Sequence, residues 1–349
     1  MTSIKVGLLG FGKHAREVML PSFQEAQEIE LVALATSSEN FAQLESGIAA
    51  KLLNFASYQE LLDQSSLDAT YIALPNHLHF EWVNKALNSG KHVLCEKPLA
   101  LTALEAQSIC SLAREKSLLV AEAFMYRYHP QQRLVREIIA SKELGEIRRL
   151  EIVFQYNLHD ASNIRLRPDA RGGALNDVGC YGIDWSCLIL GSLPYRVSGT
   201  QRIDPRYGVD TFTTFCLTFP GEIVANITSS TELPRRNSFT IHCTKGSISV
   251  DSSFRIPRTQ KAIVKIERLA EHGKTKTESI QLASANQYSL MLDGFADSIQ
   301  NQNALDESLI TNAQILEATR TALQSRKTVE IVAALRATIL SGISEGVKP

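Results

Sequence analysis

The pattern of apolar and polar positions along this chain changes at Phe124. Before that residue, short apolar runs alternate with segments whose apolar residues repeat at helical spacing, as at Phe80–Asn88 and Ala103–Glu115. Strands are expected at the apolar runs Ile4–Leu9, Leu31–Ala35, Ala69–Leu74, His92–Cys95 and Leu118–Ala121. Apolar strands that alternate with helices predict an α/β, doubly wound parallel sheet, whose ligands lie at the carboxyl ends of its strands.

After Phe124 the chain predicts a different layout. A helix is expected at Gln131–Ser141, a strand at Arg148–Asn157 and a glycine-led helix at Ala174–Leu190. Two-residue alternation follows: in Thr211–Phe219 the residues Phe215, Leu217 and Phe219 share one face, and the pattern continues near Ile223–Ile227 and Phe239–Cys243. Such alternation predicts a largely antiparallel sheet with unlike faces. Helices at Tyr288–Asn301 and Ser308–Ser325 and a hairpin or exposed loop at Ala270–Thr277 complete the prediction.

Composition narrows the class of protein. A chain of 349 residues with 44% hydrophobic and 21% charged residues is expected to form two globular domains. The net charge of -1 and the lack of a long apolar window argue against a nucleic-acid or membrane partner. The first strand follows the N-terminus so closely that no signal peptide is expected. Six cysteines without a CxxC pair favour reduced thiols, a cytoplasmic location and no metal site.

A glycine-rich turn follows the first strand. Its sequence is Gly10-Phe11-Gly12-Lys13-His14-Ala15. The first glycine permits a tight turn, the second lets backbone approach a pyrophosphate, and the small third residue lets the helix pack closely. The helix N-terminus then offers amide groups to the phosphate. The pattern predicts dinucleotide binding, although a turn that merely needs glycine has the same appearance.

The end of the second strand bears on the choice of dinucleotide. NAD selectivity usually requires a carboxylate there, whereas this chain has Thr36-Ser37-Ser38, with Glu39 arriving late. Hydroxyls remove the repulsion that would reject a 2′-phosphate, and Lys13 and His14 could supply positive charge. NADP is therefore favoured over NAD, although no arginine follows the serines.

Two further strand ends complete the expected cofactor site. The segment Leu74-Pro75-Asn76 with His79 closes one strand, and Glu96-Lys97-Pro98 closes the next. We expect Leu74, Pro75, Asn76, His79, Glu96 and Lys97 to line the cofactor, while a plain strand-to-helix turn would also explain the first segment. His77 and His79 make a poor metal pair, because the helical carboxylate–histidine motif is missing.

A glycine-led polar stripe carries the second candidate site. In the run from Gly172 to Asp184, the residues Asp177, Tyr181 and Asp184 stand at i, i+4 and i+7 of a helix. Hydride transfer at a carbinol carbon needs a group that exchanges the hydroxyl proton, and a tyrosine beside a lysine ammonium is suited to this task. Tyr181 and Lys97 are therefore the candidate catalytic pair. A hydrogen-bonded core tyrosine and a solvated lysine paired with Glu96 remain the alternatives.

These motifs together resemble the glucose–fructose oxidoreductase, inositol dehydrogenase and rhizopine-catabolism family. The resemblance rests on Gly10-Phe11-Gly12, Pro75-Asn76 with His79, Glu96-Lys97-Pro98, Glu122-Ala123-Phe124-Met125 and the run from Gly172 to Asp184, and it covers nearly the whole chain. It implies an N-terminal Rossmann domain (1–123) and a C-terminal α+β domain (124–349) with a large, open, mostly antiparallel sheet. The resemblance also implies a homodimer or homotetramer formed through that sheet.

The same resemblance assigns roles to residues. It implies that Lys97 orients the substrate, that Asp177 is a substrate or network carboxylate and that Tyr181 is the general acid/base. Tyrosine at 181, where many inositol-specific members carry histidine, resembles the branch of xylose dehydrogenase, dihydrodiol dehydrogenase and sugar 3-ketoreductases. Arg165 is expected to contact substrate, and Arg165, Arg167 and Arg171 could bind an acidic substituent or form a salt-bridged surface loop.

The expected function is therefore NAD(P)-dependent oxidation or reduction of a sugar, ketosugar or related polyol or diol. One alternative is a redox-assisted glycosidase that keeps NAD bound. The other is a non-enzymatic dinucleotide-binding sensor.

Overall fold

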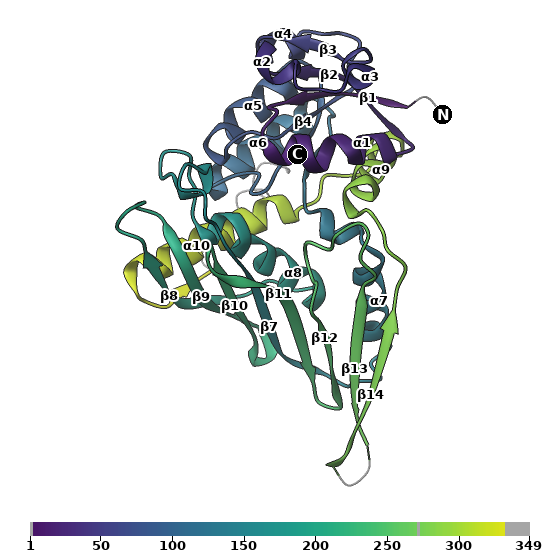
Figure 1. Cartoon of the computed structure of the whole chain (residues 1–349). Coiled ribbons are helices and arrows are strands. Elements are labelled where there is room, and N and C mark those ends of the chain that lie inside the picture. Colours follow the sequence, from purple (N-terminus) through teal and green to yellow (C-terminus); the bar gives the residue numbers. More distant parts are fainter. Residues whose placement is uncertain (1–2, 271–272, 332–349) are drawn as a thin grey trace, which may run out of the picture. The chain divides into compact units, whose positions relative to one another are not determined.

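The computed structural model describes residues 3–270 and 273–331, which divide into two compact units (Figure 1). Within the described part, the first unit contains residues 3–132, 256–260 and 283–310. The second contains residues 133–255, 261–270, 273–282 and 311–331. The chain therefore leaves the first unit and returns to it twice.

The first unit is built on a six-stranded parallel sheet in the order β3-β2-β1-β4-β5-β6. Its strands are β1 (Ile4–Leu9), β2 (Ile29–Ala35), β3 (Leu53–Phe55), β4 (Ala69–Ile72), β5 (His92–Cys95) and β6 (Val120–Glu122). The order of strands reverses next to β1, as in doubly wound dinucleotide-binding folds. Apolar residues on both faces of the central strands are buried, which explains why these strands are continuous hydrophobic runs.

Helices lie between these strands along the chain, and one more joins the unit from late in the sequence. They are α1 (Leu20–Glu25), α2 (Ser38–Phe41), α3 (Ser46–Ala49), α4 (Tyr58–Leu62), α5 (Asn76–Asn88), α6 (Ala103–Glu115) and, from late in the chain, α9 (Gln287–Gln300). A π-helical turn, η1 (Ala15–Met19), precedes α1, and a 3-10 turn, η2 (Met125–Tyr128), follows β6. In α6, Thr102 and Glu105 form a complete capping box, which fixes where this helix begins.

The second unit contains a nine-stranded sheet in the order β14-β13-β12-β11-β7-β10-β9-β8-β15. Its strands are β7 (Ile147–Asn157), β8 (Arg196–Ile203), β9 (Asp210–Phe219), β10 (Ile223–Ser230), β11 (Glu232–Cys243), β12 (Gly246–Val250), β13 (Ile263–Leu269), β14 (Thr275–Gln281) and β15 (Val329–Glu330). Neighbouring strands run antiparallel, except for the parallel pair β7 and β10. This confirms the predicted largely antiparallel sheet.

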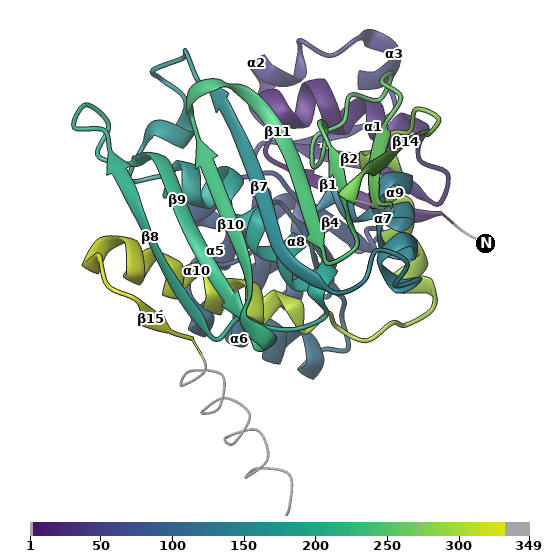
Figure 2. The same ribbon diagram turned by 90° about the horizontal axis from the view of Figure 1, so that it is seen from below.

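The second unit also contains helices. They are α7 (Pro130–Ala140), the π-helical turn η4 (Leu175–Gly179), α8 (Cys180–Leu190) and α10 (Ser308–Ser325), with short 3-10 turns η3 (Ile164–Leu166) and η5 (Pro220–Glu222). Those labelled α8 and α10 lie behind this sheet in the view of Figure 2. Gly182 lets α8 approach β10 closely, since a Cβ there would lie 2.6 Å from Cγ2 of Ile227. The glycine therefore serves a strand rather than a ligand.

Most predicted elements are present, with informative exceptions. The hairpin expected around Ala270–Thr277 is formed by β13 and β14, while residues 271 and 272 lie outside the described part. Short β3 was not predicted, because three residues carry too little periodicity to stand out. The parallel pairing of β7 with β10 is likewise a tertiary feature that alternation cannot show.

Candidate functional site

The glycine turn after β1 has the shape that a bound phosphate requires. Gly10 has a φ of +87°, and a Cβ there would lie 2.7 Å from Leu74 Cδ2 and 2.9 Å from the Ala73 carbonyl oxygen. Gly12 differs, because a Cβ there would meet no protein atom within 4 Å. The open space beside Gly12 and the buried Ala15 fit the predicted roles of the second and third small residues. The residues present therefore fit a dinucleotide pyrophosphate.

The carboxyl ends of the neighbouring strands carry the other predicted cofactor residues. Thr36 is buried after β2, while Ser37 and Ser38 are exposed there. The Ser37 hydroxyl accepts a hydrogen bond from the Asn40 amide at 3.3 Å and so caps α2. After β4, Leu74 is buried and Pro75 stands at the N-cap position of α5, which begins at Asn76. Phe11 is buried and Lys13 is exposed.

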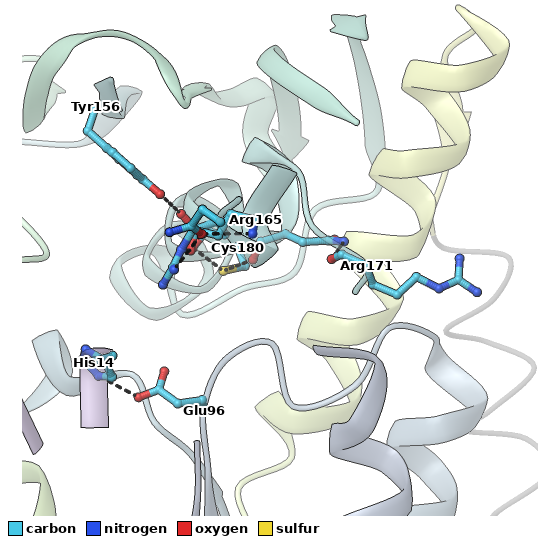
Figure 3. Close-up of polar contacts among 9 residues, drawn as sticks. His14, Glu96, Tyr156, Arg165, Arg171 and Cys180 are labelled. Carbon is cyan, nitrogen blue, oxygen red and sulfur yellow. Dashed lines mark hydrogen bonds and ion pairs between the residues drawn. The ribbon is translucent and has the colours of Figure 1, made fainter. Parts of the chain in front are cut away.

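Glu96 joins two of these elements. Its Oε1 lies 3.1 Å from Nε2 of His14 and also accepts the hydroxyl hydrogen of Tyr71 on β4. Burial works to raise the pKa of Glu96, but His14, Lys97 and Tyr71 outweigh it and lower the pKa to about 2. Burial and the Glu96 carboxylate raise the pKa of Tyr71 well above 10.0, so this tyrosine remains a donor. Glu96 is therefore a fixed anion in contact with His14 (Figure 3).

The backbone that follows Lys97 is held by contacts with two side chains, His79 and Glu122. The Lys97–Pro98 peptide bond is cis, the Pro98 carbonyl lies 2.8 Å from Nδ1 of His79, and the Leu99 amide donates to Glu122 at 2.8 Å. The other ring nitrogen of His79 lies 2.8 Å from the Leu74 carbonyl, and this side chain is 1% exposed. Both ring nitrogens therefore face the chain's own carbonyls. The expected place of His79 along the cofactor stays a prediction. The observed role of His79 is to tie the Leu74 turn to the segment that bears Lys97.

In the second unit, the helix that bears Asp177 and Tyr181 starts at a constrained glycine. Gly173 has a φ of +107°, and a Cβ there would lie 2.1 Å from Oδ1 of Asp210. The other carboxylate oxygen of Asp210 accepts hydrogen bonds from the Leu175 amide at 2.7 Å and from Thr213 at 2.8 Å. Burial raises the pKa of Asp210 to about 6, although these two bonds work in the opposite direction. Asp210 thus holds the first turn of the helix in place.

Asp177 lies in a cluster with Tyr156 and Arg165, which we call the Asp177 cluster. Arg165 Nε donates to Oδ1 at 2.9 Å, and the Tyr156 hydroxyl donates to Oδ2 at 2.5 Å. Tyr156 and Arg165, both labelled in Figure 3, donate to different oxygens of the same carboxylate. Asp177 is only 8% exposed, so its charge is compensated by these donors rather than mainly by water.

Tyr181 is 4% exposed and is surrounded by aromatic rings. Its ring centroid lies 5.2 Å from that of Phe154 and 5.5 Å from that of Phe254. Contacts of this kind fix the ring and leave the hydroxyl as its polar end. The third residue of the predicted stripe, Asp184, has a separate role, because its Oδ1 accepts a hydrogen bond from Asn312 of α10 at 2.7 Å.

Two of the three arginines before the glycines each pair with a carboxylate. Arg165 pairs with Asp177, and Arg167 forms an exposed pair with Asp169. The carbonyl of Arg171 accepts a hydrogen bond from the Asn176 side chain at 3.0 Å. The two ion pairs favour a salt-bridged loop over an anion-binding cluster at Arg165 and Arg167.

Two residues of this region were missed in the sequence, Tyr156 and Asp210. Tyr156 continues the two-residue alternation of Leu150, Ile152 and Phe154, which are the buried face of β7. Its parity with those residues was a usable signal that it faces inward. Asp210 directly precedes an alternating strand, and nothing in that position marks a contact with a glycine 37 positions earlier in the chain.

Neither a candidate metal site nor a membrane-spanning helix is found in residues 3–270 and 273–331. In that part of the chain, no group of three or more histidine, cysteine, aspartate or glutamate side chains is placed to hold a metal ion. Among the same residues, no helix is both long and apolar enough to cross a bilayer.

Comparison with known proteins assigns both units. Residues 4–124 match the oxidoreductase family with an NAD-binding Rossmann fold, and residues 132–249 match the GFO/IDH/MocA C-terminal domain. D-xylose 1-dehydrogenase (NADP(+)) 2 of Haloferax volcanii is 34% identical, over 84% of this chain and 88% of the relative. A dTDP-3,4-didehydro-2,6-dideoxy-alpha-D-glucose 3-reductase of Saccharopolyspora spinosa is 32% identical, over 90% of this chain and 96% of the relative.

Solved structures agree with this assignment. A 3-ketoreductase from Actinomadura kijaniata, crystallised with NADP and TDP-benzene, superimposes with a TM-score of 0.86 at 29% identity. The match covers 92% of this chain and 98% of the 3-ketoreductase. The chain therefore belongs to the GFO/IDH/MocA oxidoreductase family, with an NAD-binding Rossmann domain followed by that family's C-terminal domain.

Proposed function

We propose that this protein is an NADP-dependent oxidoreductase that transfers a hydride between nicotinamide and a hydroxyl-bearing carbon of a sugar, ketosugar or related diol. One observation carries the proposal. This chain, a member of the family, has both an open glycine turn and a helix that bears Asp177 and Tyr181. Relatives named as an NADP-dependent xylose dehydrogenase and as sugar 3-ketoreductases support the substrate class.

NADP is proposed over NAD because of the residues after β2. Thr36, Ser37 and Ser38 present hydroxyls where an NAD-selective site carries a carboxylate. A 2′-phosphate placed there would meet no negative side chain from these three positions. The NADP complex of the 3-ketoreductase supports the same choice.

In the proposed reaction each residue has one task. When bound, the nicotinamide supplies or accepts the hydride. Tyr181 gives the proton to the substrate oxygen in reduction and takes it back in oxidation, and Lys97 hydrogen-bonds that oxygen and orients it. Asp177 accepts a hydrogen bond from a neighbouring hydroxyl of the substrate, so that the reacting carbon is fixed in one orientation.

The compartment and the assembly belong to the same proposal. We infer a cytoplasmic enzyme, because the six cysteines are scattered along the chain without a CxxC pair. We infer a homodimer or homotetramer, as the family resemblance implies. Light scattering after gel filtration measures the assembly, and a monomeric mass at micromolar concentration would contradict that inference.

The proposal is tested with wild-type enzyme, free NADPH or NADP+, and a panel of aldoses, ketosugars, dTDP-linked ketosugars and trans-dihydrodiols. We expect a change in absorbance at 340 nm with at least one substrate, and a product that carries deuterium when the cofactor is deuterated at C4. A silent panel, in which dinucleotide binds but is never turned over, would instead support a sensor. Hydrolysis of a glycoside with NAD tightly bound and no net cofactor change would support the redox-assisted glycosidase.

A further inference from the structure

The Asp177 cluster contains a tyrosine for which the proposed reaction has no task. Tyr156 lies near the end of β7, which is paired on one side with β10 and on the other with β11. Its hydroxyl donates to Oδ2 of Asp177, while Arg165 donates to Oδ1. The two oxygens of one carboxylate are thus anchored by two different elements of the second unit, the sheet and the η3 loop.

The two anchors differ in rigidity. Arg165 comes from a short 3-10 turn, and its side chain is 37% exposed with several rotatable bonds. Tyr156 comes from an interior strand of a nine-stranded sheet and has only two side-chain torsions. The position of the Asp177 carboxylate is therefore set mainly by Tyr156, and Arg165 balances its charge.

The direction of this hydrogen bond is fixed by proton affinity. Burial, followed by the Asp177 carboxylate, raises the pKa of Tyr156 far above the ordinary 10.0. Tyr156 therefore remains a phenol across the pH range in which an enzyme of this class works, and it can only donate to the carboxylate. A tyrosine held in this state cannot exchange protons with a substrate, which leaves that task to Tyr181.

We propose that Tyr156 is a positioning residue: by donating to Oδ2, it holds Asp177 as an ionised acceptor aimed at a substrate hydroxyl next to the reacting carbon. The proposal rests on the proposed function and adds a substrate requirement to it. A sugar with a free hydroxyl beside the reacting carbon is preferred over its deoxy analogue, because only the hydroxyl can donate to the carboxylate. Asp177 and Tyr156 act through hydrogen bonds alone in this scheme, and neither changes its protonation state during turnover.

The first test is independent of turnover. Wild-type protein is labelled with tyrosine carrying carbon-13 at Cζ, and Tyr156→Phe identifies the resonance of Tyr156. We expect this resonance to stay at the phenol position up to pH 11, and to titrate at lower pH in Asp177→Asn, which removes the neighbouring negative charge. A Tyr156 resonance that titrates near ~10, like a solvated tyrosine, would overturn the proposal even if the enzyme is active.

The second test measures positioning. We expect Tyr156→Phe to lower kcat/KM for the best sugar by about tenfold to a hundredfold, the size of a lost hydrogen bond to a charged group. The ratio of kcat/KM for the sugar over its deoxy analogue should fall by a similar factor, and the acidic limb of the pH profile should move to higher pH, because the carboxylate has lost a donor. Binding of NADPH should not change.

A matched control separates positioning from a general effect on the fold. Tyr195 of the same unit also donates to a carboxylate, Glu222, at 2.7 Å, but on the exposed surface. Tyr195→Phe should leave both the sugar preference and the pH profile as in the wild type. An unchanged preference for the hydroxyl-bearing sugar in Tyr156→Phe would overturn the proposed role. An inactive wild type would refute the proposed function instead, and the carbon-13 titration would still decide whether Tyr156 donates to Asp177.

Discussion

His14 and Glu96 join the glycine turn after β1 to the end of β5, with 3.1 Å between Nε2 and Oε1. His14 lies in the helix that follows the glycine turn, and Glu96 directly precedes Lys97 at the end of β5. The contact couples the geometry of the phosphate turn to the position of the lysine. Tyr71 donates to the same carboxylate oxygen. Loss of the Glu96 charge should therefore disturb both the glycine turn and the segment that bears Lys97.

Glu96→Gln should destabilise the protein at pH 7 but not at pH 2. The folded pKa of about 2 lies below the ordinary 4.5, so ionised Glu96 stabilises the fold above pH 4.5, and this contribution disappears as pH falls through 2. The difference in pKa corresponds to an upper value of about 3 kcal/mol at pH 7. Urea unfolding of wild type and variant between pH 2 and 7 measures it, with exposed Glu60→Gln as the control. A parallel pair of stability curves would show that the carboxylate contributes nothing.

Alanine substitution of the two glycines of the turn should have different effects, on stability at Gly10 and on NADPH binding at Gly12. Gly10→Ala forces a side chain into a backbone with a φ of +87° and against Leu74, so it should lower the free energy of unfolding by about 1–3 kcal/mol. Gly12→Ala meets no protein atom within 4 Å and should fold like the wild type, yet weaken NADPH binding about tenfold or more. Thermal unfolding and fluorescence titration with NADPH separate the two effects. If Gly12→Ala binds NADPH normally, the pyrophosphate does not lie where we place it.

Ser37→Asp should shift the cofactor preference toward NADH. Aspartate can replace serine as the cap of α2, so the fold should be kept, while a carboxylate now faces the position assigned to the 2′-phosphate. We expect the ratio of kcat/KM for NADPH over NADH to fall about tenfold to a hundredfold. Ser57→Asp, at the cap of α4, provides a matched change elsewhere in the same unit and should leave the ratio unaltered. An unchanged ratio in Ser37→Asp would argue against NADP selection at this strand end.

The stabilising contribution of Asp210 should depend on pH in the direction opposite to that of Glu96, and Asp210→Asn should remove this dependence. The pKa of Asp210 is raised from 3.8 to about 6, so this contribution is fully present below pH 3.8 and is lost as pH rises through 6. The wild type should therefore lose up to about 3 kcal/mol from this group across that window, and the variant should not. Unfolding by urea at pH 4, 5, 6 and 7 measures the difference. A wild type and variant with the same slope between pH 4 and 6 would contradict this account of Asp210.

The sequence predicted correctly the bounds of elements that are defined by their own local pattern. Strands β1 and β5 and helix α6 have the predicted bounds, because burial on both faces or a capping box defines each of them locally. The sequence was a poor guide to side-chain partners. Asp177, Tyr181 and Asp184 were placed on one stripe of a regular α-helix, whereas a π-helical turn spans Leu175–Gly179 and changes the angular step.

Partners that come from distant strands explain the remaining differences. Asp177 is fixed by Tyr156 on β7, Asp184 by Asn312 on α10, and Gly173 is constrained by Asp210 at the start of β9. Each contact depends on which strands and helices become neighbours in the second unit. Local periodicity indicates which face is buried and does not identify the residue on the other side of the contact.

A double-mutant cycle on Lys97 and Tyr181 tests most directly whether these two residues serve the same substrate oxygen. Lys97→Met and Tyr181→Phe should each lower kcat by about a hundredfold or more while NADPH binding is kept. Because both act on one proton transfer, the double variant should be no more than about tenfold slower than the slower single variant. Losses that multiply in the double variant, or a Tyr181→Phe enzyme with wild-type turnover, would contradict the account.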